Sequence, residues 1–421
     1  MLSLLRSSMN RRWNSSNKYK SEPSAAGPAL LRLALLVPAL FGTGAQAGQN
    51  DALHPFFSLA YTHDDNLLRV PEGQPAFDNT LGDSTRSSIG GLVFDKGYGR
   101  QRLHAEGKLT KVKFGHFSQL DYDGKDLLAR WNWQFGNDMY GTLSSAYNQV
   151  LAPYTDFHSS ERNLRVQRTG VADGYWRFLP SWRAHVEASN TEYSYDLLSQ
   201  RYNNRTEELR AIGFDYIAST RSTIGLVVRK IKGKYPNKRV IGPIVIDDSF
   251  EQEEAKAHIN WLATDATTVN FLGGWARRTH VFFGDRDSKG ANGRLTVTSI
   301  VTGSTQLNAA LWREFSALES SFVSYSLNKG ASIGASWVAT SKIQVDASLS
   351  NERRSYVPNV AIAATDFSDT LKSASLGLNY SAATYLQLGA SVYHQARTGI
   401  AAVGTTGFKA NGMTVTATAQ F

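Results

Sequence analysis

The sequence predicts an all-β fold, a single transmembrane antiparallel β-barrel of about 18 strands, with 16 strands as the alternative. Three observations support this prediction. After residue 48, short segments alternate apolar with polar residues, tight turns and longer polar loops separate these segments alternately, and no stretch has the 3.6-residue period of an amphipathic helix. Amphipathic strands in a membrane must close on themselves, because each unpaired backbone N–H or C=O in hydrocarbon costs several kcal/mol.

Residues 1–47 have the features of a signal peptide. Basic residues precede or border the apolar stretch Leu33–Phe41, and the small residues that follow end in Ala45–Ala47, an A-x-A cleavage signal. We therefore expect cleavage after this signal, a periplasmic amino-terminal segment over 48–55 and a barrel over 56–421.

Composition excludes several classes of protein. The chain has no cysteine, which excludes a disulfide framework, a thiolate metal site and an acylated cysteine. No apolar run approaches the roughly 18 residues of a membrane-spanning helix, so membrane insertion must use strands. The signal segment carries +5 of the formal net charge of +9, which leaves +4 for the mature chain and little compositional support for nucleic-acid binding.

Eight tight turns set the strand count. The turns carry the Gly, Asn, Asp, Ser and Pro that turn geometry favours. They are expected at Asp95–Gly97, Gly136–Asp138, Leu179–Ser181, Ala218–Thr220, Thr264–Ala266, Thr302–Ser304, Thr340–Lys342 and Ala382–Thr384. These turns join strands in pairs, and a first strand at Phe56–Thr62 and a last strand lie outside them, which gives 18. An even number places both termini on the same side, expected to be periplasmic.

An aromatic residue precedes most of these turns at a fixed position. The pairs are Asn132-Trp133, Tyr175-Trp176, Asp215-Tyr216, Asn260-Trp261, Ser336-Trp337 and Asn379-Tyr380. This is an internal repeat of two strands, one turn and one loop. A β-propeller has repeats of similar length, but only a membrane barrel needs aromatic rings at one depth, where they form an interfacial girdle.

The last strand, Met413–Phe421, alternates strictly between an apolar and a polar face. A secreted β-protein can contain such a strand. A closing strand that ends the chain on an aromatic residue resembles those of bacterial outer-membrane barrels. The resemblance implies that Phe421 is an assembly signal read by the barrel-assembly machinery.

The polar faces of the strands are expected to line a wet lumen. On one strand Leu103 and Leu109 face lipid and the charged residues between them face inward. The candidate lumen-lining residues are Arg102, His104, Lys108, Arg130, Arg183, His185, Lys256 and His258. Charged groups line barrels because they must face water, but a wall of one sign also attracts anionic solutes.

Four longer irregular stretches, 64–83, 192–205, 235–249 and 354–369, are expected to form outer loops. Their aromatic and amide side chains suit contacts with sugars and equally suit generic surface loops. Examples are Tyr193, Tyr195, Tyr202, Asn203 and Asn204.

No catalytic residue, cofactor or metal is expected. The chain has no G-x-S-x-G context for a serine nucleophile, and its histidines stand on strands distant in sequence. Asp64–Asn66 lacks the spacing of a Ca²⁺ loop and is expected to cap the first loop through Asx turns.

The stretch Phe56–Arg69 reads F-F-S-L-A-Y-T-H-D-D-N-L-L-R. A strand that runs into D-D-N-L-hydrophobic-R resembles the β-barrel porins encoded with exopolysaccharide-synthesis and exosortase genes, the EpsL type. The motif opens the mature domain in those proteins, and here it comprises Asp64, Asp65, Asn66 and Arg69. The resemblance covers about residues 51–421 and supplies no catalytic residues.

This resemblance implies an outer-membrane protein that assists the export of an extracellular polysaccharide, as conduit or accessory. The implied partners are the polymer or its oligosaccharides, outer-membrane lipids and lipopolysaccharide, and other polysaccharide-export proteins, with no nucleic acid. Two alternatives stay open from the residues alone: a general or sugar-uptake porin, and a structural barrel that anchors an envelope complex.

Overall fold

A computed structural model describes residues 52–421 apart from 242, 282–286, 318–322, 359–366 and 400–406. The expected signal peptide and its cleavage site lie outside the described residues. No helix among the described residues is long and apolar enough to cross a membrane.

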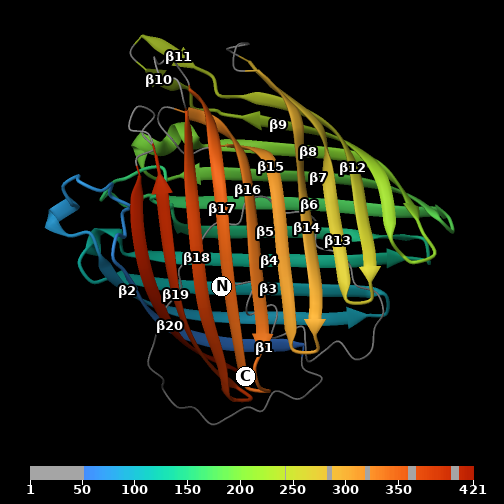
Figure 1. The fold of residues 1–421 in the computed structure, drawn as a ribbon, viewed down its shortest axis with the longest axis horizontal. Helices are drawn as coiled ribbons and strands as arrows, with labels where there is room; N and C mark the ends of the chain where they lie inside the picture. Colours follow the sequence, from blue (N-terminus) through green and yellow to red (C-terminus); the bar gives the residue numbers. More distant parts are fainter. Residues whose placement is uncertain (1–51, 242, 282–286, 318–322, 359–366, 400–406) are drawn as a thin grey trace.

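Eighteen antiparallel strands form one closed sheet, which confirms the predicted barrel and its strand number. Closure is direct, because β1 pairs with both β2 and β20 and β9 pairs with β12. In Figure 1 the strands of the front wall cross those of the rear wall at a large angle, as expected of opposite walls of tilted strands. The barrel strands are β1 (Leu53–Asp64), β2 (Asp83–Tyr98), β3 (Gln101–Phe114), β4 (Tyr122–Phe135), β5 (Met139–Leu151), β6 (Leu164–Leu179), β7 (Trp182–Tyr195), β8 (Arg205–Ile217), β9 (Thr223–Lys234), β12 (Phe250–Thr264), β13 (Thr267–His280), β14 (Ser288–Thr302), β15 (Thr305–Ala317), β16 (Val323–Val338), β17 (Ile343–Pro358), β18 (Ser368–Ala383), β19 (Leu386–Thr398) and β20 (Phe408–Gln420).

The remaining elements belong to the loops. They are the hairpin β10 (Arg239–Ile241) and β11 (Ile244–Ile246) and the 3₁₀ helices η1 (Phe77–Asn79), η2 (Ser118–Leu120) and η3 (Leu198–Asn203). The hairpin stands beyond the barrel wall at the upper left of Figure 1. All four stretches expected to be irregular contain regular structure: η1 in 64–83, η3 and the end of β7 in 192–205, the hairpin in 235–249, and the end of β17 with the start of β18 in 354–369.

The outward face of the wall is apolar. On β12 the inward Gln252, Glu254 and Lys256 are buried, whereas the outward Ala255 and Trp261 are exposed. Large exposed apolar side chains recur at outward positions around the ring, including Leu109, Leu127, Ile212, Leu226, Leu311, Ile333, Leu349, Leu376, Val392 and Val415. Soluble monomers rarely present a continuous apolar surface of this extent, so the outer face suits a hydrocarbon environment.

The short turns share one rim of the barrel, and exposed aromatic rings surround that rim. Trp176, Tyr216, Trp261, Trp337 and Tyr380 are exposed, and Trp133 is half-buried. Seven turns lie at or next to their expected positions. The first does not: β2 continues through Asp95–Gly97 and turns at Gly99, whose φ of 59° lies in the left-handed region that glycine tolerates.

The seam between β1 and β20 closes the barrel. Its register runs from Phe56 opposite Gln420 to Asp64 opposite Gly412. Hydroxyl pairs connect the inward side, with Ser58 Oγ and Thr418 Oγ1 2.8 Å apart. β1 begins at Leu53, so residues 53–55, expected to precede the barrel, belong to its first strand. Both ends of the barrel chain therefore lie on the short-turn rim.

We predict that deletion of Phe421, or Phe421→Lys, lowers the yield of assembled barrel. The Phe421 backbone N–H donates to Pro55 O at 2.9 Å across the seam, and its ring is half exposed. Loss of heat-modifiable migration on gels measures the defect, and Phe421→Tyr is the control that keeps a terminal aromatic residue. Normal folding and surface display of the lysine variant would contradict an assembly role.

Candidate functional site: the lumen and its outer constriction

Three of the expected lumen-lining residues lie on β3 beside carboxylates. Arg102 Nε donates to Asp95 Oδ1 at 2.9 Å, and His104 Nδ1 lies 3.2 Å from Asp95 Oδ2. The register places His104 directly opposite Asp95. Lys108 Nζ lies 2.8 Å from Glu106 Oε1 on the same face of its own strand. The residue Asp95, expected in a turn, thus supplies a counter-charge to the wall.

Three more expected residues converge on Asp215 of β8. Arg183 Nε donates to Asp215 Oδ2 at 2.7 Å, and His185 Nδ1 lies 3.3 Å from the same oxygen. His258 Nδ1, from β12, lies 3.6 Å from Asp215 Oδ1. The Asp215 side chain is fully buried, so this carboxylate is enclosed by the three basic groups.

Two glycines make this convergence possible. The register places Arg183, Asp215, Gly225 and His258 in one row across β7, β8, β9 and β12. A Cβ at Gly225 would clash with Asp215 Oδ1, so the missing side chain lets Asp215 and His258 approach each other over β9. Likewise a Cβ at Gly213 would clash with the His185 ring.

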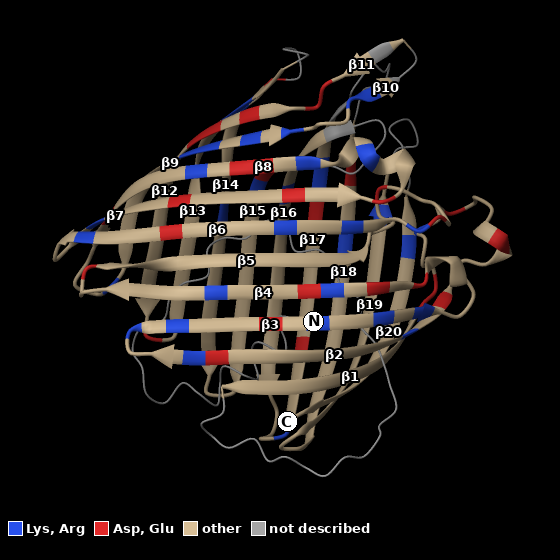
Figure 2. Ribbon diagram, turned by 180° about the vertical axis from the view of Figure 1, so that it is seen from behind, with Lys and Arg blue, Asp and Glu red and all other residues tan. Residues whose placement is uncertain are grey.

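The remaining expected residues occupy separate places on the wall. Lys256 Nζ lies 2.9 Å from Glu254 Oε2 and donates to Asn292 Oδ1 at 2.7 Å. Arg130 lies on the face of β4 opposite the exposed Leu127. The sequence analysis selected these basic residues but did not identify Asp95, Asp215 and Glu254 as their partners, so the wall around them is of mixed charge rather than mainly basic. Figure 2 shows both signs on the barrel strands.

At the rim opposite the short turns, the β5–β6 loop (152–163) crosses the lumen. Around the wall, β4, β3, β2, β1 and β20 separate β5 from β19. Asp156 of this loop nevertheless reaches Arg354 Nη1 of β17 at 3.2 Å and Arg397 Nη1 of β19 at 3.1 Å. Arg397 also donates to Thr155 O.

A second carboxylate holds the same two arginines from the wall side. Asp369 of β18 accepts from Arg354 Nη2 at 2.7 Å and from Arg397 Nε at 2.5 Å, and it accepts from the Tyr356 hydroxyl. Arg354, Arg397 and Asp369 are all buried. Each arginine is therefore fixed between a carboxylate of the wall and a carboxylate of the crossing loop, and the loop narrows this end of the lumen.

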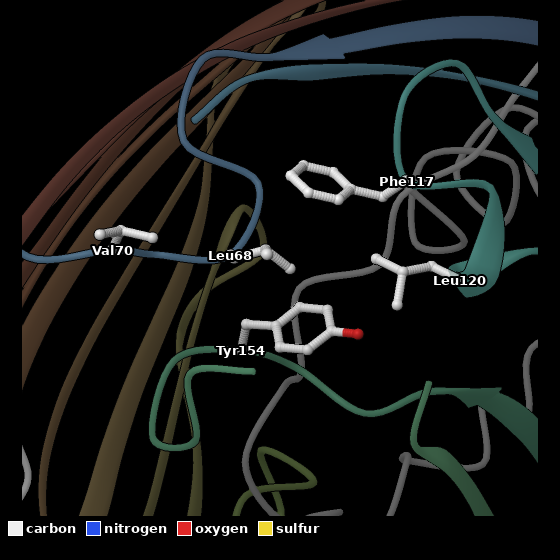
Figure 3. Packing of buried hydrophobic residues seen from close by; sticks show 5 residues of the cluster. All are labelled: Leu68, Val70, Phe117, Leu120 and Tyr154. Carbon is white, nitrogen blue, oxygen red and sulfur yellow. The ribbon is translucent and has the colours of Figure 1, made fainter. Parts of the chain in front are cut away.

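The crossing loop also joins a buried apolar cluster formed by three loops. Figure 3 shows Leu68 of the first loop, Phe117 and Leu120 of the second, and Tyr154 of the crossing loop directed toward one another. His158 Nδ1 lies 3.1 Å from Leu68 O. These contacts make the three loops one folded body at the mouth of the barrel.

The Asp64–Arg69 motif fastens this body to the closing strands. Arg69 Nη1 donates to both oxygens of Asp64, at 2.9 and 2.8 Å, and the Tyr393 hydroxyl of β19 also donates to Asp64. The Asn66 N–H donates to Asp64 Oδ1 at 2.9 Å, which is the expected Asx turn. Arg69 has a left-handed φ of 55° that these contacts hold in place.

The other two motif residues reach β20. Asn66 Nδ2 donates to Lys409 O at 2.9 Å. Asp65 accepts from the Asn411 backbone N–H at 2.6 Å and from Asn411 Nδ2 at 2.7 Å. All four motif residues therefore bind the first loop to the barrel seam or to each other.

The loop tyrosines considered for sugar contacts are used within the protein. The Arg205 guanidinium lies 3.9 Å from the Tyr193 ring centre, and that of Arg239 lies 4.1 Å from the Tyr202 ring centre. Tyr195 and Asn203 are buried. Inward-facing rings lie deeper in the barrel, where Tyr140 and Tyr175 stack with their centres 5.2 Å apart beside Arg183.

The sequence matches no protein-family model and no curated protein. Among solved structures, it is similar to OpdK of Pseudomonas aeruginosa, crystallised with vanillate, at 9% identity over 88% of this chain and 99% of that chain, with a TM-score of 0.46. It is similar to the siderophore receptor PirA of Pseudomonas aeruginosa at 12% identity over 89% and 81% of the two chains, with a TM-score of 0.42. A bacterial polysaccharide outer membrane secretin matches at 10% identity over 88% and 99%, with a TM-score of 0.35. At these identities and TM-scores the matches do not assign a function.

We predict that Gly225→Ala destabilises the barrel by about 1–3 kcal/mol, because the added Cβ overpacks the Asp215 site. Gly170→Ala on β6 is the matched control, since no atom lies within 4 Å of the place that its Cβ would take. The temperature at which the folded band disappears from heat-modifiability gels gives the comparison. Equal stability of the two variants would show that the row of residues around Asp215 is not close-packed.

We predict that Asp156→Asn weakens the attachment of the crossing loop by about 1–3 kcal/mol, because two buried charge-assisted contacts lose their acceptor charge. Asp369 still pairs both arginines, so the wall stays intact. Single-channel conductance in planar bilayers should rise and become noisier. Asp247→Asn, which affects contacts with Lys238 and the Ser249 N–H in another loop, should leave conductance unchanged.

The same ion pairs predict a pH dependence. Burial raises the pKa of the Asp156 carboxyl, but Arg354 and Arg397 outweigh this effect and hold the pKa below its ordinary value of 3.8. The contribution of Asp156 to closure is therefore complete above that ordinary value and is lost as the pH falls through the lower folded-state pKa. Conductance of the native protein should be constant from neutral pH down to about 4 and rise only in more acidic solution. A rise centred near pH 6 would assign the transition to another group.

Proposed function

We propose that this protein is an outer-membrane barrel that serves as a conduit, without catalysis, for an extracellular polysaccharide on its way out of the cell. The observation that carries the proposal is the closed wall of 18 strands, apolar outside and charged inside. A barrel of this size encloses an aqueous lumen, whereas a barrel of eight strands is filled by its own side chains.

The apolar outer face and the aromatic ring at the short-turn rim support an outer-membrane location. In this proposal the short turns and both ends of the barrel chain face the periplasm, and the crossing loop faces outward. Cleavage of the signal peptide after Ala47 belongs to the same proposal.

The character of the inner wall supports passage of a hydrophilic polymer. Its basic residues stand beside carboxylates such as Asp95, Asp215 and Glu254, so the wall offers many hydrogen-bonding groups without a strong field of one sign. A sugar chain can exchange such contacts one after another as it moves. The Asp64–Arg69 motif, with its resemblance to the EpsL-type porins, supports a polysaccharide as the cargo.

A sugar-uptake porin is the second candidate, and one observation favours it. The stacked inward rings of Tyr140 and Tyr175, with the Arg183 guanidinium 4.7 Å from the Tyr175 ring centre, offer an apolar face and a donor to a small sugar.

Deletion of the gene, followed by measurement of polymer in the medium and in the periplasm, tests the proposal. We expect secreted polymer to fall and periplasmic polymer to rise, and expression of the native chain should restore secretion. Expression of Asp156→Asn should restore secretion at least as well, since it loosens the constriction. Unchanged polymer together with lost uptake of small sugars would reject export and favour the uptake porin.

A further inference from the structure

The wall fixes the two arginines of the outer constriction by one side of each guanidinium. Asp369 lies directly opposite Arg354 in the register of β17 and β18. It accepts from Arg354 Nε at 2.9 Å and from Arg354 Nη2 at 2.7 Å, and it also accepts from Arg397 Nε. The Tyr356 hydroxyl accepts from Arg397 Nη2 at 3.3 Å. These contacts occupy the wall side of both guanidiniums, and the Nη1 group of each is directed at the crossing loop.

The two Nη1 groups meet at one carboxylate. Asp156 Oδ1 lies 3.2 Å from Arg354 Nη1 and 3.1 Å from Arg397 Nη1. Asp156 Oδ2 lies 3.3 Å from Arg354 Nη1. Guanidinium groups present their N–H donors in a planar fork that matches the two oxygens of a carboxylate. Arg354 and Arg397, held from behind by Asp369, therefore form a seat for one carboxylate, which we call the arginine cradle.

Asp156 is held more loosely in this group than Asp369. Its contacts with Arg354, at 3.2 and 3.3 Å, are longer than the 2.9 and 2.7 Å contacts of Asp369 with the same arginine. The Asp156 side chain is 18% exposed, whereas those of Asp369 and Arg397 are fully buried. The carboxylate of the loop is thus the one that a carboxylate from the lumen can replace.

The loop that carries Asp156 has anchors apart from the arginine cradle. Tyr154 packs in the apolar cluster with Leu68 and Phe117 (Figure 3). His158 Nδ1 lies 3.1 Å from Leu68 O. These contacts attach the crossing loop to the first and second loops rather than to β17 and β19. Asp156 can therefore leave the cradle while the rest of the loop stays attached to its neighbours.

Charge balance decides what can take the place of Asp156. In the group of four, two guanidinium charges are balanced by the carboxylates of Asp369 and Asp156. Withdrawal of Asp156 alone leaves one buried positive charge without compensation, which is costly. A neutral sugar supplies hydrogen bonds but no charge. A carboxylate from the solute restores the charge balance and the hydrogen bonds together, whereas a phosphate monoester carries more negative charge than the cradle would have lost.

One further carboxylate faces the same end of the lumen. Glu352 is one inward position from Arg354 on β17, toward the short turns. Glu352 Oε2 accepts from Trp312 Nε1 at 2.7 Å, and Glu352 Oε1 accepts from Asn328 Nδ2 at 3.2 Å. Its charge repels anions near the cradle, and this repulsion is weaker for a singly charged carboxylate than for a doubly charged phosphate.

We propose that the arginine cradle binds the carboxylate groups of an acidic polysaccharide, and that Asp156 is its internal competitor. The proposal rests on the function proposed above and deepens it, because it names the class of polymer as one whose sugars carry carboxylates, such as uronic acids. A tethered group acts at an effective concentration in the millimolar range, so an isolated acidic sugar displaces Asp156 poorly. A chain with carboxylates on successive sugars presents many such groups at once and displaces it readily.

The test uses the whole barrel purified in an uncharged detergent, with hexagalacturonate as the acidic probe and maltohexaose as the neutral probe of the same length. Isothermal titration calorimetry near neutral pH gives the affinities. Asp156→Asn removes the charge of the internal competitor and keeps its size. Asp156→Asn/Arg397→Gln also removes one charge of the cradle, and it stays charge-balanced because Arg354 still pairs with Asp369.

Asp156→Asn should bind hexagalacturonate roughly tenfold or more tightly than the native protein, because the competing carboxylate is gone. The double variant should bind it on the order of thirtyfold more weakly than Asp156→Asn, because the carboxylate of the probe loses a buried charged partner. Maltohexaose should bind all three proteins weakly and equally. Asp247→Asn, the control in another loop, should match the native protein with both probes.

Three results would overturn the proposal. Unchanged binding of hexagalacturonate by Asp156→Asn would show that Asp156 competes with nothing. Equal tightening for maltohexaose would show that a loosened loop admits any sugar. Binding of inorganic phosphate by Asp156→Asn as tightly as hexagalacturonate would make the cradle a plain anion site.

A second charge-balanced variant, Asp156→Asn/Arg354→Gln, covers the case in which the first double variant does not fold, and it should lose the same affinity. Binding is measured on the purified barrel, so its outcome is separate from secretion in cells. Unchanged secretion after deletion of the gene would reject export and leave the binding result standing. Lack of binding would reject the acidic class of polymer and leave export of a neutral polymer untouched.

Discussion

The structure depends on the pairing of the backbone across the β1–β20 seam. A sheet in hydrocarbon has no water to satisfy its edge N–H and C=O groups, so an open barrel would leave two rows of unpaired groups at a cost of several kcal/mol each. Here nine residue pairs, from Phe56 opposite Gln420 to Asp64 opposite Gly412, remove both edges. The residues on the inward side of the seam are small and carry hydroxyl groups, so they let β1 and β20 approach each other. Their hydroxyls also form hydrogen bonds across the seam, and Thr62 Oγ1 lies 2.8 Å from Thr414 Oγ1.

Closure of the barrel divides the side chains between an inward face toward the lumen and an outward face. Charged side chains find their partners in different ways on these two faces. The inward face is concave and crowded, so side chains from non-adjacent strands meet, as Asp215 and His258 do over Gly225. Buried charges there require partners, because an unpaired charge in a crowded wall loses its hydration without compensation. The outward face diverges, so a cation there meets partners on adjacent strands, as Lys232 of β9 does 2.6 Å from Glu251 of β12.

Period-two alternation, together with the tight turns, was sufficient to predict the strands and the closed barrel, and on several strands it also indicated which side faces inward. Partners across strands could not be predicted, because they depend on register, and register depends on where each turn falls. Asp95 illustrates this. It was predicted to lie in a turn, where it would face no residue of another strand, but β2 continues beyond it and places it directly opposite His104. The alternation of residues along β9 gives no reason to expect a glycine at position 225. Its place between Asp215 and His258 follows only from the register of β8, β9 and β12.

The loop contacts were beyond prediction for a different reason. The β5–β6 loop was not among the irregular stretches selected as outer loops, yet its Asp156 contacts Arg354, 198 positions away. Ion pairs at such separation leave no local pattern. The Asp64–Arg69 motif was found because of its resemblance to a family, but its partners Tyr393 and Asn411 again came only from the closed seam.

The lumen differs at its two ends, and β17 shows the difference along one strand. Its inward Ser348 is exposed toward the short-turn side, whereas Arg354 and Tyr356, on the same face nearer the loops, are buried. The inner face of β17 is therefore more open toward the short turns than toward the folded loops. Those loops are held to one another by apolar packing and to the far wall by the ion pairs of Asp156, so the loop can leave that wall without any change in the hydrogen-bonded strands. The loop contacts can be displaced one at a time, as the proposed passage of a polymer chain would require.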